Sequence, residues 1–325
     1  MSTAKNTTAT LSAPRVSYTC FAVSVSRIEP MGSSFVRITF SGVDLAHFHY
    51  IGLDQRIKLV LPNGESGLDA FPHDSDDWYS AWRETPETVR PVLRTYTVRA
   101  ARPELHEIDV DFVIHGDTGP ATRWVNRAVV GASIFVVGPD ARTLDPLDER
   151  RVGGAEFNPG VAGRILLAGD ETAAPAICSI VEALPAKSRG QVFIEVPSAA
   201  DILPVATPGG VTICWLARDE RPSLLRGEAL DRAVRAWVSE MMPVPNAAEV
   251  PAAADKLADV DVDTEMLWEV PATPDADTEP HTLYAWLAGE AGCIKELRRF
   301  LVRDTGLHRS DVAFMGYWRL GRSEN

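Results

Sequence analysis

The sequence predicts two domains, an N-terminal antiparallel β-barrel followed by a C-terminal α/β domain with a parallel sheet. Three observations support this fold class. The chain has 325 residues, which is long enough for two domains of ordinary size. Its first half contains short β-prone segments that end near glycine, proline or asparagine. Its second half alternates between β-prone and helical segments, which is typical of a parallel sheet covered by helices.

Six strands are expected in the first half, each rich in β-branched and aromatic residues. They cover residues 17–30, 34–42, 55–64, 92–100, 107–116 and 132–139. Turn-like connections between such strands favour an antiparallel barrel or sandwich. We expect this domain to occupy residues 17–150, after a flexible tail at 1–16.

The second domain is expected at residues 151–325. Its strands are predicted at 163–170, 191–196, 211–217, 283–290 and 312–321, and its helices at 172–186, 227–241 and 291–306. An insertion at 243–280 holds ten acidic residues and one lysine, so it accounts for −9 of the net charge of −13. It is rich in proline and alanine, so we expect it to be solvated. Only "EMLWEVP", at 265–271, is apolar enough to dock as a short strand.

Composition narrows the class of protein. Hydrophobic residues make up 45% of the chain and charged residues 24%, which is typical of a globular protein. No apolar run approaches the roughly 18 residues of a membrane span, and the first residues lack the apolar core of a signal peptide. The four cysteines are scattered, as reduced thiols in a cytoplasmic protein would be. We expect no membrane or nucleic-acid partner and no metal site; a monomer is favoured.

Two stretches of the first half have unusual chemistry. In "RTYTVR", at 94–99, strand alternation places Arg94 and Tyr96 on one face and Thr97 on the other. The stretch "HGDTGPATRW", at 115–124, follows a strand and opens a helix with glycine and proline. Free N–H groups at such a helix start attract an anion such as phosphate. Taken alone, each stretch is also compatible with an ordinary strand surface or an ordinary capped helix.

Three stretches of the second half also stand out. "GDETAAPAI", at 169–177, follows a strand and opens a helix, which is where a dinucleotide binds in α/β sheets, although it lacks the G-x-G-x-x-G pattern. "AGEAG", at 288–292, repeats that geometry or forms a plain tight turn. The terminal "GYWRLG", at 316–321, either packs into the core or presents an aromatic ring to a ligand.

Together and in this order, the motifs "RTYTVR", "HGDTGPATRW", "LLAGDETAAPAI", "WLAGEAG" and "FMGYWRLGR" resemble those of the siderophore-interacting protein family. These proteins are flavin-dependent ferric-siderophore reductases built on the ferredoxin–NADP reductase plan. The resemblance covers residues 17–322. It departs from the family in the acidic insertion and in an extended segment at 66–91.

The resemblance implies FAD as the cofactor, with an aromatic ring against the isoalloxazine, a polar partner near N5 and a cation at the pyrophosphate. Tyr96, Thr97 and Arg94 fill these three roles. The expected FAD residues are Arg94, Tyr96, Thr97, His115, Gly116, Gly119, Pro120, Ala121, Thr122 and, covering the ring from the C-terminus, Trp318. Trp124 is as compatible with the helix core as with a contact to adenine.

The resemblance also implies a nicotinamide coenzyme, NADPH in preference to NADH. The expected coenzyme residues are Asp170, Thr172, Ala173, Ala174, Gly289, Glu290 and, for a 2′-phosphate, Arg218. Many ferric siderophores are anionic, so a local basic rim is needed on a net-negative protein. Lys58 and Arg123 are the candidates for this rim, with Arg298 and Arg299 as rivals.

The implied activity is that of a ferric-siderophore reductase. NADPH gives a hydride to FAD, and single electrons then reduce the siderophore-bound Fe(III) to Fe(II). Two alternatives stay open at this point. One is a reductase of the same plan that acts on free flavin, a quinone or an electron carrier, and the other is a siderophore-binding protein without turnover.

Overall fold

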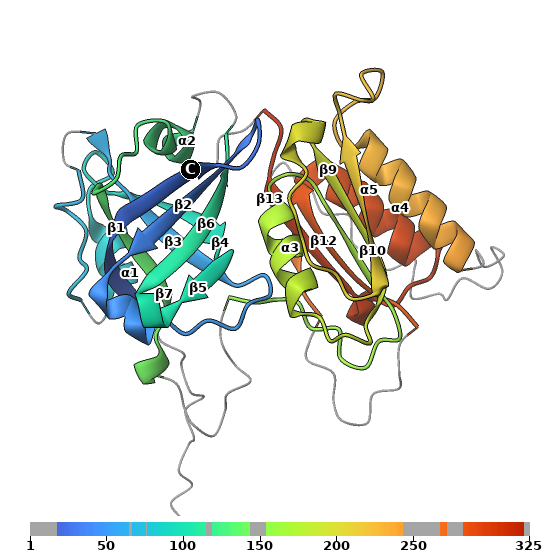
Figure 1. Cartoon of the computed structure of the whole chain (residues 1–325), viewed down its shortest axis with the longest axis horizontal. Coiled ribbons are helices and arrows are strands. Elements are labelled where there is room, and N and C mark those ends of the chain that lie inside the picture. Colours follow the sequence, from blue (N-terminus) through green and yellow to red (C-terminus); the bar gives the residue numbers. More distant parts are fainter. Residues whose placement is uncertain are drawn as a thin grey trace, which may run out of the picture.

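The computed structural model describes residues 18–64, 67–75, 77–114, 119–143, 154–242, 267–271 and 282–321. The tail expected at 1–16 and most of the acidic insertion at 243–280 lie outside the described residues. The described residues form two β-sheets in two lobes that stand side by side (Figure 1). The predicted fold class, a β-barrel domain followed by a parallel α/β domain, is confirmed.

The first sheet has seven antiparallel strands in the order β4-β3-β7-β1-β2-β6-β5. The strands are β1 (Tyr18–Pro30), β2 (Phe35–Ser41), β3 (Arg56–Leu61), β4 (Val92–Thr97), β5 (Ala100–Arg102), β6 (Glu107–Val113) and β7 (Ser133–Pro139). Between β4 and β5, Val98 N–H donates to Gln55 O at 2.8 Å and Arg99 N–H donates to Asp109 O at 2.9 Å. The chain therefore passes from one edge of the sheet to the other, which curls the sheet into a partly closed barrel.

Apolar side chains from alternate strand positions fill this barrel, as the two-residue period requires. Phe21, Ile38, Phe40, Ile57 and Phe112 are at most 1% exposed. The short helix α2 (Pro120–Val125) covers the barrel with its buried residues Ala121 and Val125.

The extended segment at 66–91 packs on the outside of the barrel. It contains helix α1 (Trp78–Glu84). Phe71 and Trp78 of this segment form a small apolar cluster with Val60 of β3 and Val137 of β7. The described part of this segment, where the sequence departs from the family pattern, therefore covers an outer face of the sheet.

The second sheet has six strands in the order β10-β9-β8-β12-β13-β11. They are β8 (Ile165–Gly169), β9 (Arg189–Val196), β10 (Gly210–Ala217), β11 (Trp268–Glu269), β12 (Tyr284–Glu290) and β13 (Val312–Trp318). The first five in that order are parallel, and β11 pairs antiparallel with β13 at the edge. The short strand expected within 265–271 is therefore present in the described residues 267–271.

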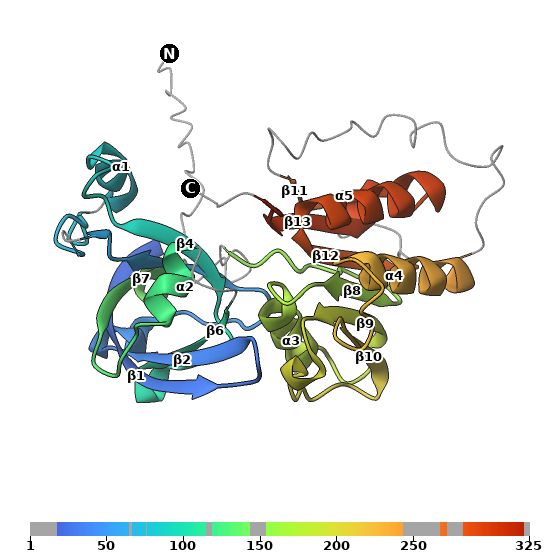
Figure 2. The ribbon, with the colours of Figure 1, turned by 90° about the horizontal axis from the view of Figure 1, so that it is seen from above.

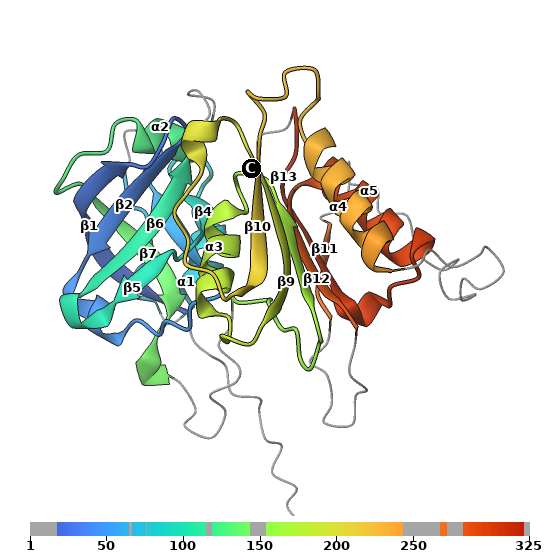
Figure 3. The same cartoon turned by 45° about the vertical axis from the view of Figure 1, so that its right-hand side comes forward.

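Helices cover both faces of this sheet (Figures 2 and 3). Helix α3 (Ala174–Ala183) lies on the face toward the barrel, and α4 (Glu228–Met241) and α5 (Ala291–Arg299) lie on the other face. Most of α3 is buried because it packs between the sheet and the barrel. No helix in the described ranges is long and apolar enough to cross a membrane.

Polar contacts hold the two lobes together. The buried carboxylate of Asp54 accepts hydrogen bonds from Phe157 N–H at 3.0 Å and from Trp286 Nε1 at 3.2 Å. Burial raises the pKa of Asp54 above its ordinary value. On the other side of the junction, Arg99 forms a two-pronged ion pair with Glu182 of α3, with N–O distances of 2.6 and 2.7 Å.

We expect Glu182→Gln to lower the free energy of unfolding by about 1 kcal/mol, because the buried Arg99 guanidinium loses a charged partner while a hydrogen-bond acceptor remains. Urea unfolding measures this change. Glu104→Gln, at an exposed position on the barrel, is the matched control and should change stability by less than about 0.5 kcal/mol. Equal stabilities of the two variants would show that the ion pair does not stabilise the junction.

Candidate functional site

The strand β4 presents Arg94 and Tyr96 on one face, as alternation predicts. In the β3–β4 register Arg94 lies opposite Leu59 and Tyr96 lies opposite Ile57. Both partners are core residues, so the Arg94 and Tyr96 side chains leave the sheet on its core side. Both side chains are half-buried, and Arg94 donates a hydrogen bond to Leu93 O at 2.8 Å. Thr97 is buried.

An aromatic cluster links β4 to α2. The ring of Tyr96 lies 4.5 Å from that of Phe112, and the ring of Trp124 in α2 lies 6.2 Å from Phe112 and 6.1 Å from Phe40. Trp124 is therefore half-buried and packs against the barrel core. The cluster brings the start of α2, where Gly119 is the N-cap and Pro120 the first helical residue, to the same part of the barrel as Tyr96.

The remaining barrel residues of the predicted FAD site divide into two groups. Ala121 is buried on the side of α2 that packs on the barrel core, and Thr122 is half-buried in the first turn of α2. His115 and Gly116, together with residues 117 and 118, lie outside the described residues. A half-buried phenol ring, a guanidinium and a glycine-led helix start on one barrel fit a planar, anionic cofactor such as FAD.

In the α/β domain, the carboxylate of Asp170 joins three of the motifs. It accepts hydrogen bonds from Thr172 N–H at 2.9 Å and Thr172 Oγ1 at 2.6 Å, from Glu290 N–H at 2.8 Å and from Trp318 Nε1 at 2.8 Å. Gly289 makes this approach possible, since a Cβ at Gly289 would lie 2.8 Å from the Asp170 carboxyl carbon and its φ of +146° is strained for other residues. The ends of β8, β12 and β13 therefore meet at one carboxylate.

The environment of Asp170 raises the pKa of its carboxyl group. Burial, followed by the negative charge of Glu171, raises the pKa of Asp170 from 3.8 to about 6. The hydrogen bonds from Thr172 and Trp318 oppose this shift. The next two turn residues, Ala173 and Ala174, are fully buried, and both N–H groups donate to Asp170 O at 3.0 Å.

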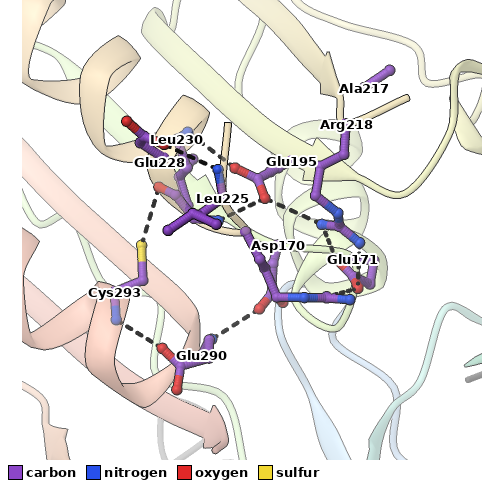
Figure 4. A network of polar contacts seen from close by, with 12 residues as sticks. Asp170, Glu171, Glu195, Ala217, Arg218, Leu225, Glu228, Leu230, Glu290 and Cys293 are labelled. Atoms are coloured by element: carbon purple, nitrogen blue, oxygen red, sulfur yellow. Dashed lines mark hydrogen bonds and ion pairs between the residues drawn. The ribbon is translucent and has the colours of Figure 1, made fainter. Parts of the chain in front are cut away.

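A second charged cluster adjoins this carboxylate (Figure 4). Arg218 donates to both carboxylate oxygens of Glu171, at 2.8 and 2.9 Å, and to Glu195 at 3.2 Å. Arg226 also forms an ion pair with Glu171. Burial alone would raise the pKa of Glu171, but hydrogen bonding from Arg218 and the charges of both arginines hold it below its ordinary value. Both glutamate side chains are 0% exposed.

Glu195 has a structural role in this cluster. Its carboxylate accepts hydrogen bonds from Gly227 N–H at 2.8 Å and Leu230 N–H at 3.1 Å, at the start of α4. These groups are among the backbone donors that have no partner within a helix. Arg218 was predicted to bind a 2′-phosphate. In the structure its guanidinium lies in a network of two buried glutamates, which also bind Arg226 and the backbone N–H groups at the start of α4.

The two aromatic residues near the C-terminus, Tyr317 and Trp318, have different environments. Tyr317 stacks on Trp268 of β11 with the ring centres 6.0 Å apart, and it lies edge-on to Trp286 at 6.4 Å. Trp318 is half-buried, with its indole N–H on Asp170 and the Arg226 guanidinium over its ring at 5.2 Å. Tyr317 therefore belongs to the core, whereas Trp318 lies with the predicted coenzyme residues.

The four predicted substrate cations lie in different places. Lys58 is exposed and donates to Thr95 Oγ1 at 2.6 Å, on the side of β3 opposite to Ile57 and Tyr96. Arg123 is exposed on α2, next to the FAD residues. Arg298 is buried and pairs with Glu269 at 2.6 Å, and Arg299 pairs with Glu296 at 2.8 Å. The last two are on α5, so the structure does not bring them together with the barrel residues (Figure 3).

Sequence reasoning missed three residues of this site: Glu171, Glu195 and Arg226. Glu171 follows Asp170 directly, so its place in the strand-to-helix turn was a usable signal. Glu195 is the only carboxylate in its strand segment "QVFIEV", and a charged residue in an apolar strand indicates a buried partner. Arg226 is one of several arginines in a loop, and its partners become apparent only in the folded chain.

Two family profiles together match most of the chain. The profile described as siderophore-interacting FAD-binding domain matches residues 24–143, and the one described as siderophore-interacting protein matches residues 162–321. Among curated proteins, the chain is 29% identical over 294 residues to the ferric vibriobactin reductase ViuB of Vibrio cholerae, covering 90% of this chain and 87% of that protein. It is 25% identical over 242 residues to a ferric acinetobactin reductase of Acinetobacter baumannii, covering 74% and 65%.

Solved structures show the same arrangement. The siderophore-interacting protein SipS from Aeromonas hydrophila is 25% identical with a TM-score of 0.59, and the match covers 95% of both chains. A siderophore utilization protein from T. fusca is 25% identical with a TM-score of 0.64, covering 94% of this chain and 95% of that one. The ferredoxin reductase in carbazole 1,9a-dioxygenase shares the fold at 13% identity, with a TM-score of 0.54 and coverage of 92% and 70%.

Proposed function

The chain belongs to the siderophore-interacting protein family, and on this premise we propose that it is an NAD(P)H-dependent ferric-siderophore reductase that uses FAD. The observation that carries the proposal is the meeting of two nucleotide-type turns and a C-terminal tryptophan at Asp170. A protein that only binds siderophores has no need of this arrangement. The curated relatives described as ferric vibriobactin reductase and ferric acinetobactin reductase support the same substrate class.

The barrel residues have separate tasks in this proposal. Tyr96 stacks on the isoalloxazine, Thr97 provides a polar contact near N5, and Arg94 binds the pyrophosphate together with Gly119, Pro120, Ala121 and Thr122 at the start of α2. Bound FAD would supply the conversion between a two-electron hydride donor and a one-electron ferric acceptor. The protein itself orients both partners and excludes water between them.

The α/β domain binds the coenzyme in this proposal. Thr172 and Glu290 are held by Asp170 at the carboxyl ends of β8 and β12, which is the edge where dinucleotides bind in such sheets. Ala173, Ala174 and Gly289 keep these turns narrow. Trp318, which donates to Asp170, would cover the flavin where the nicotinamide ring lands. NADPH is proposed in preference to NADH because the resemblance to the family implies it.

Anaerobic addition of coenzyme to the FAD-loaded protein tests the proposal. We expect NADPH to bleach the flavin absorbance, and a ferric siderophore added afterwards to restore it. Restoration by a quinone but by no ferric siderophore would identify a different reductase of the same plan. A flavin that no nicotinamide coenzyme bleaches would contradict the proposed electron donor.

The substrate rim gives a separate prediction. Arg123→Gln and Lys58→Gln should each raise the KM for an anionic ferric siderophore and leave flavin reduction by NADPH unchanged, because rim charges act on encounter. The wild-type KM should rise with ionic strength, since exposed charges reach only about 8 Å at physiological salt. The double variant should lose most of this salt response. If it keeps the full response, the rim lies elsewhere; slower flavin reduction would place the residue at the cofactor instead.

A further inference from the structure

Strand β11, the described part of the acidic insertion, is fixed to the α/β domain by its backbone and by a side chain. It pairs antiparallel with β13, beside which it lies in Figure 2. Gly316 N–H donates to Leu267 O at 2.7 Å, just before β11. Glu269 forms ion pairs with the buried Arg298, at 2.6 Å, and with Arg309. The position of β11 on the sheet edge is therefore well defined.

The side chain of Trp268 in β11 connects the α/β domain to the barrel. The guanidinium of Arg56, from β3 of the barrel, lies over its indole at 4.4 Å from the ring centre. The ring of Tyr317, from the end of β13, stacks on the indole at 6.0 Å, with 19° between the planes. Cation–π and stacked aromatic contacts depend on geometry, so each partner has a preferred place relative to the indole.

The two partners of Trp268 adjoin residues that the proposed function places on the flavin. Arg56 lies opposite Thr97 in the β3–β4 register, and Thr97 is proposed to contact the flavin near N5. Tyr317 directly precedes Trp318, which is proposed to cover the flavin. Trp268 therefore links the barrel part of the proposed flavin site to the C-terminal part through one neighbour of each.

Other contacts hold the lobes together without Trp268. These are the hydrogen bonds to the Asp54 carboxylate and the ion pair between Arg99 and Glu182. A chain that lacks the Trp268 ring should therefore keep its lobes docked. What it loses is the contact that fixes the end of β13, at Tyr317, against the barrel.

We propose that Trp268 is a positioning residue, which sets the place of Trp318 relative to Thr97 and thereby the alignment of the nicotinamide with the flavin. The inference rests on the proposed function, because it requires FAD between these two residues. A misplacement of about 1 Å, caused by a change far from the reacting atoms, can lower a rate by about 100-fold. The acidic insertion thus contributes one residue to the geometry of the reaction.

Stopped-flow reduction of the FAD-loaded protein by NADPH tests the proposal. Trp268→Leu keeps an apolar side chain but removes the ring. We expect it to lower the reduction rate constant at saturating NADPH by about tenfold or more, while the half-saturating NADPH concentration stays within about threefold of wild type. Trp268→Phe keeps a ring that can stack on Tyr317 and should recover part of the rate. An unchanged limiting rate in Trp268→Leu would overturn the proposal, whatever happens to half-saturation.

Trp82→Leu is the matched control. Like Trp268, Trp82 is half-buried and has an arginine over its ring, Arg90 at 5.0 Å, but it lies in α1 on the outer face of the barrel. This variant should leave the limiting rate of flavin reduction unchanged. A rate that falls equally in both leucine variants would show a general effect of losing a packed indole and would refute the specific role of Trp268.

The fluorescence of bound FAD is a second readout, which needs no coenzyme. An indole against the isoalloxazine quenches flavin fluorescence, so Trp318→Ala should raise it. If Trp268 acts through Trp318, Trp268→Leu should raise the fluorescence in the wild-type chain and add nothing in the Trp318→Ala chain. No increase in the wild-type chain, or the same increase in both chains, would contradict the proposal.

The two proposals fail in different ways. If no nicotinamide coenzyme reduces the FAD-loaded wild type, the proposed electron donor is wrong. If the wild type is reduced and Trp268→Leu matches it in limiting rate and in flavin fluorescence, the proposed function stands and only the role of Trp268 is refuted.

Discussion

Replacing Arg94 with alanine is expected to raise the dissociation constant of FAD by about 10- to 150-fold. The guanidinium leaves β4 on the same face as Tyr96, which places a cation next to the ring that would stack on the flavin. A hydrogen bond to a charged group contributes about 1.5–3 kcal/mol, and the planar fork of arginine suits two phosphate oxygens. Fluorescence titration of the apoprotein with FAD measures the change.

Two further variants show whether the effect is specific to Arg94. Arg94→Lys keeps the charge but not the fork, so it should recover only part of the affinity. Arg27→Ala removes an exposed barrel cation that pairs with Glu29 and should leave FAD binding within about twofold of wild type. Full affinity in Arg94→Ala would refute the phosphate contact.

Asp170→Asn is expected to change how stability depends on pH. The pKa of Asp170 is raised in the folded protein to about 6 from its ordinary 3.8. The raised value means that the folded state holds this proton more tightly than the unfolded state does. The resulting stabilisation is fully present below about pH 4 and is lost as the pH rises through about 6.

The size of this effect follows from the same linkage. A shift of about two pKa units corresponds to about 3 kcal/mol, and Asp170 is buried, so solvent screens it little. The free energy of unfolding of the wild type minus that of Asp170→Asn should therefore fall by about 3 kcal/mol between about pH 4 and pH 6–7. Urea unfolding of both proteins across this pH range measures the difference. The contributions of the other acidic groups cancel in it because both proteins contain them. A difference that stays constant would show that Asp170 has an ordinary pKa.

Most of the regular structure could be predicted because its signals are local. The six predicted barrel strands and the five predicted strands of the second sheet follow from apolar patterning and turn residues in short windows. β5 was missed because three residues are too few to show a pattern, and it forms only by pairing with β6. Helix α3 is shorter than expected because Leu184, before Pro185, has extended backbone.

The site could be predicted only in part. The motifs around Asp170, Gly289 and Trp318 were recognisable, but their meeting at one carboxylate depends on the strand order β8-β12-β13, which no local pattern contains. The partners of Arg218 were not predicted for the same reason, since Glu171 and Glu195 come from two other strands' ends. Tertiary packing decides which buried ion pairs form. The sequence alone therefore does not show whether a loop arginine is paired within the protein or is available to bind a ligand.

Electron transfer from the reduced cofactor to siderophore-bound iron is the direct test of the proposed ferric-siderophore reductase activity. The FAD-loaded protein is photoreduced without oxygen or coenzyme and is then mixed with a ferric catecholate or a ferric hydroxamate complex and a ferrous-specific chelator. We predict that the oxidised flavin spectrum returns with at least one of the complexes and that about two ferrous ions are trapped per FAD, because each ferric ion accepts one electron. A flavin that stays reduced with both complexes, yet is reoxidised by a quinone, would contradict a ferric-siderophore reductase.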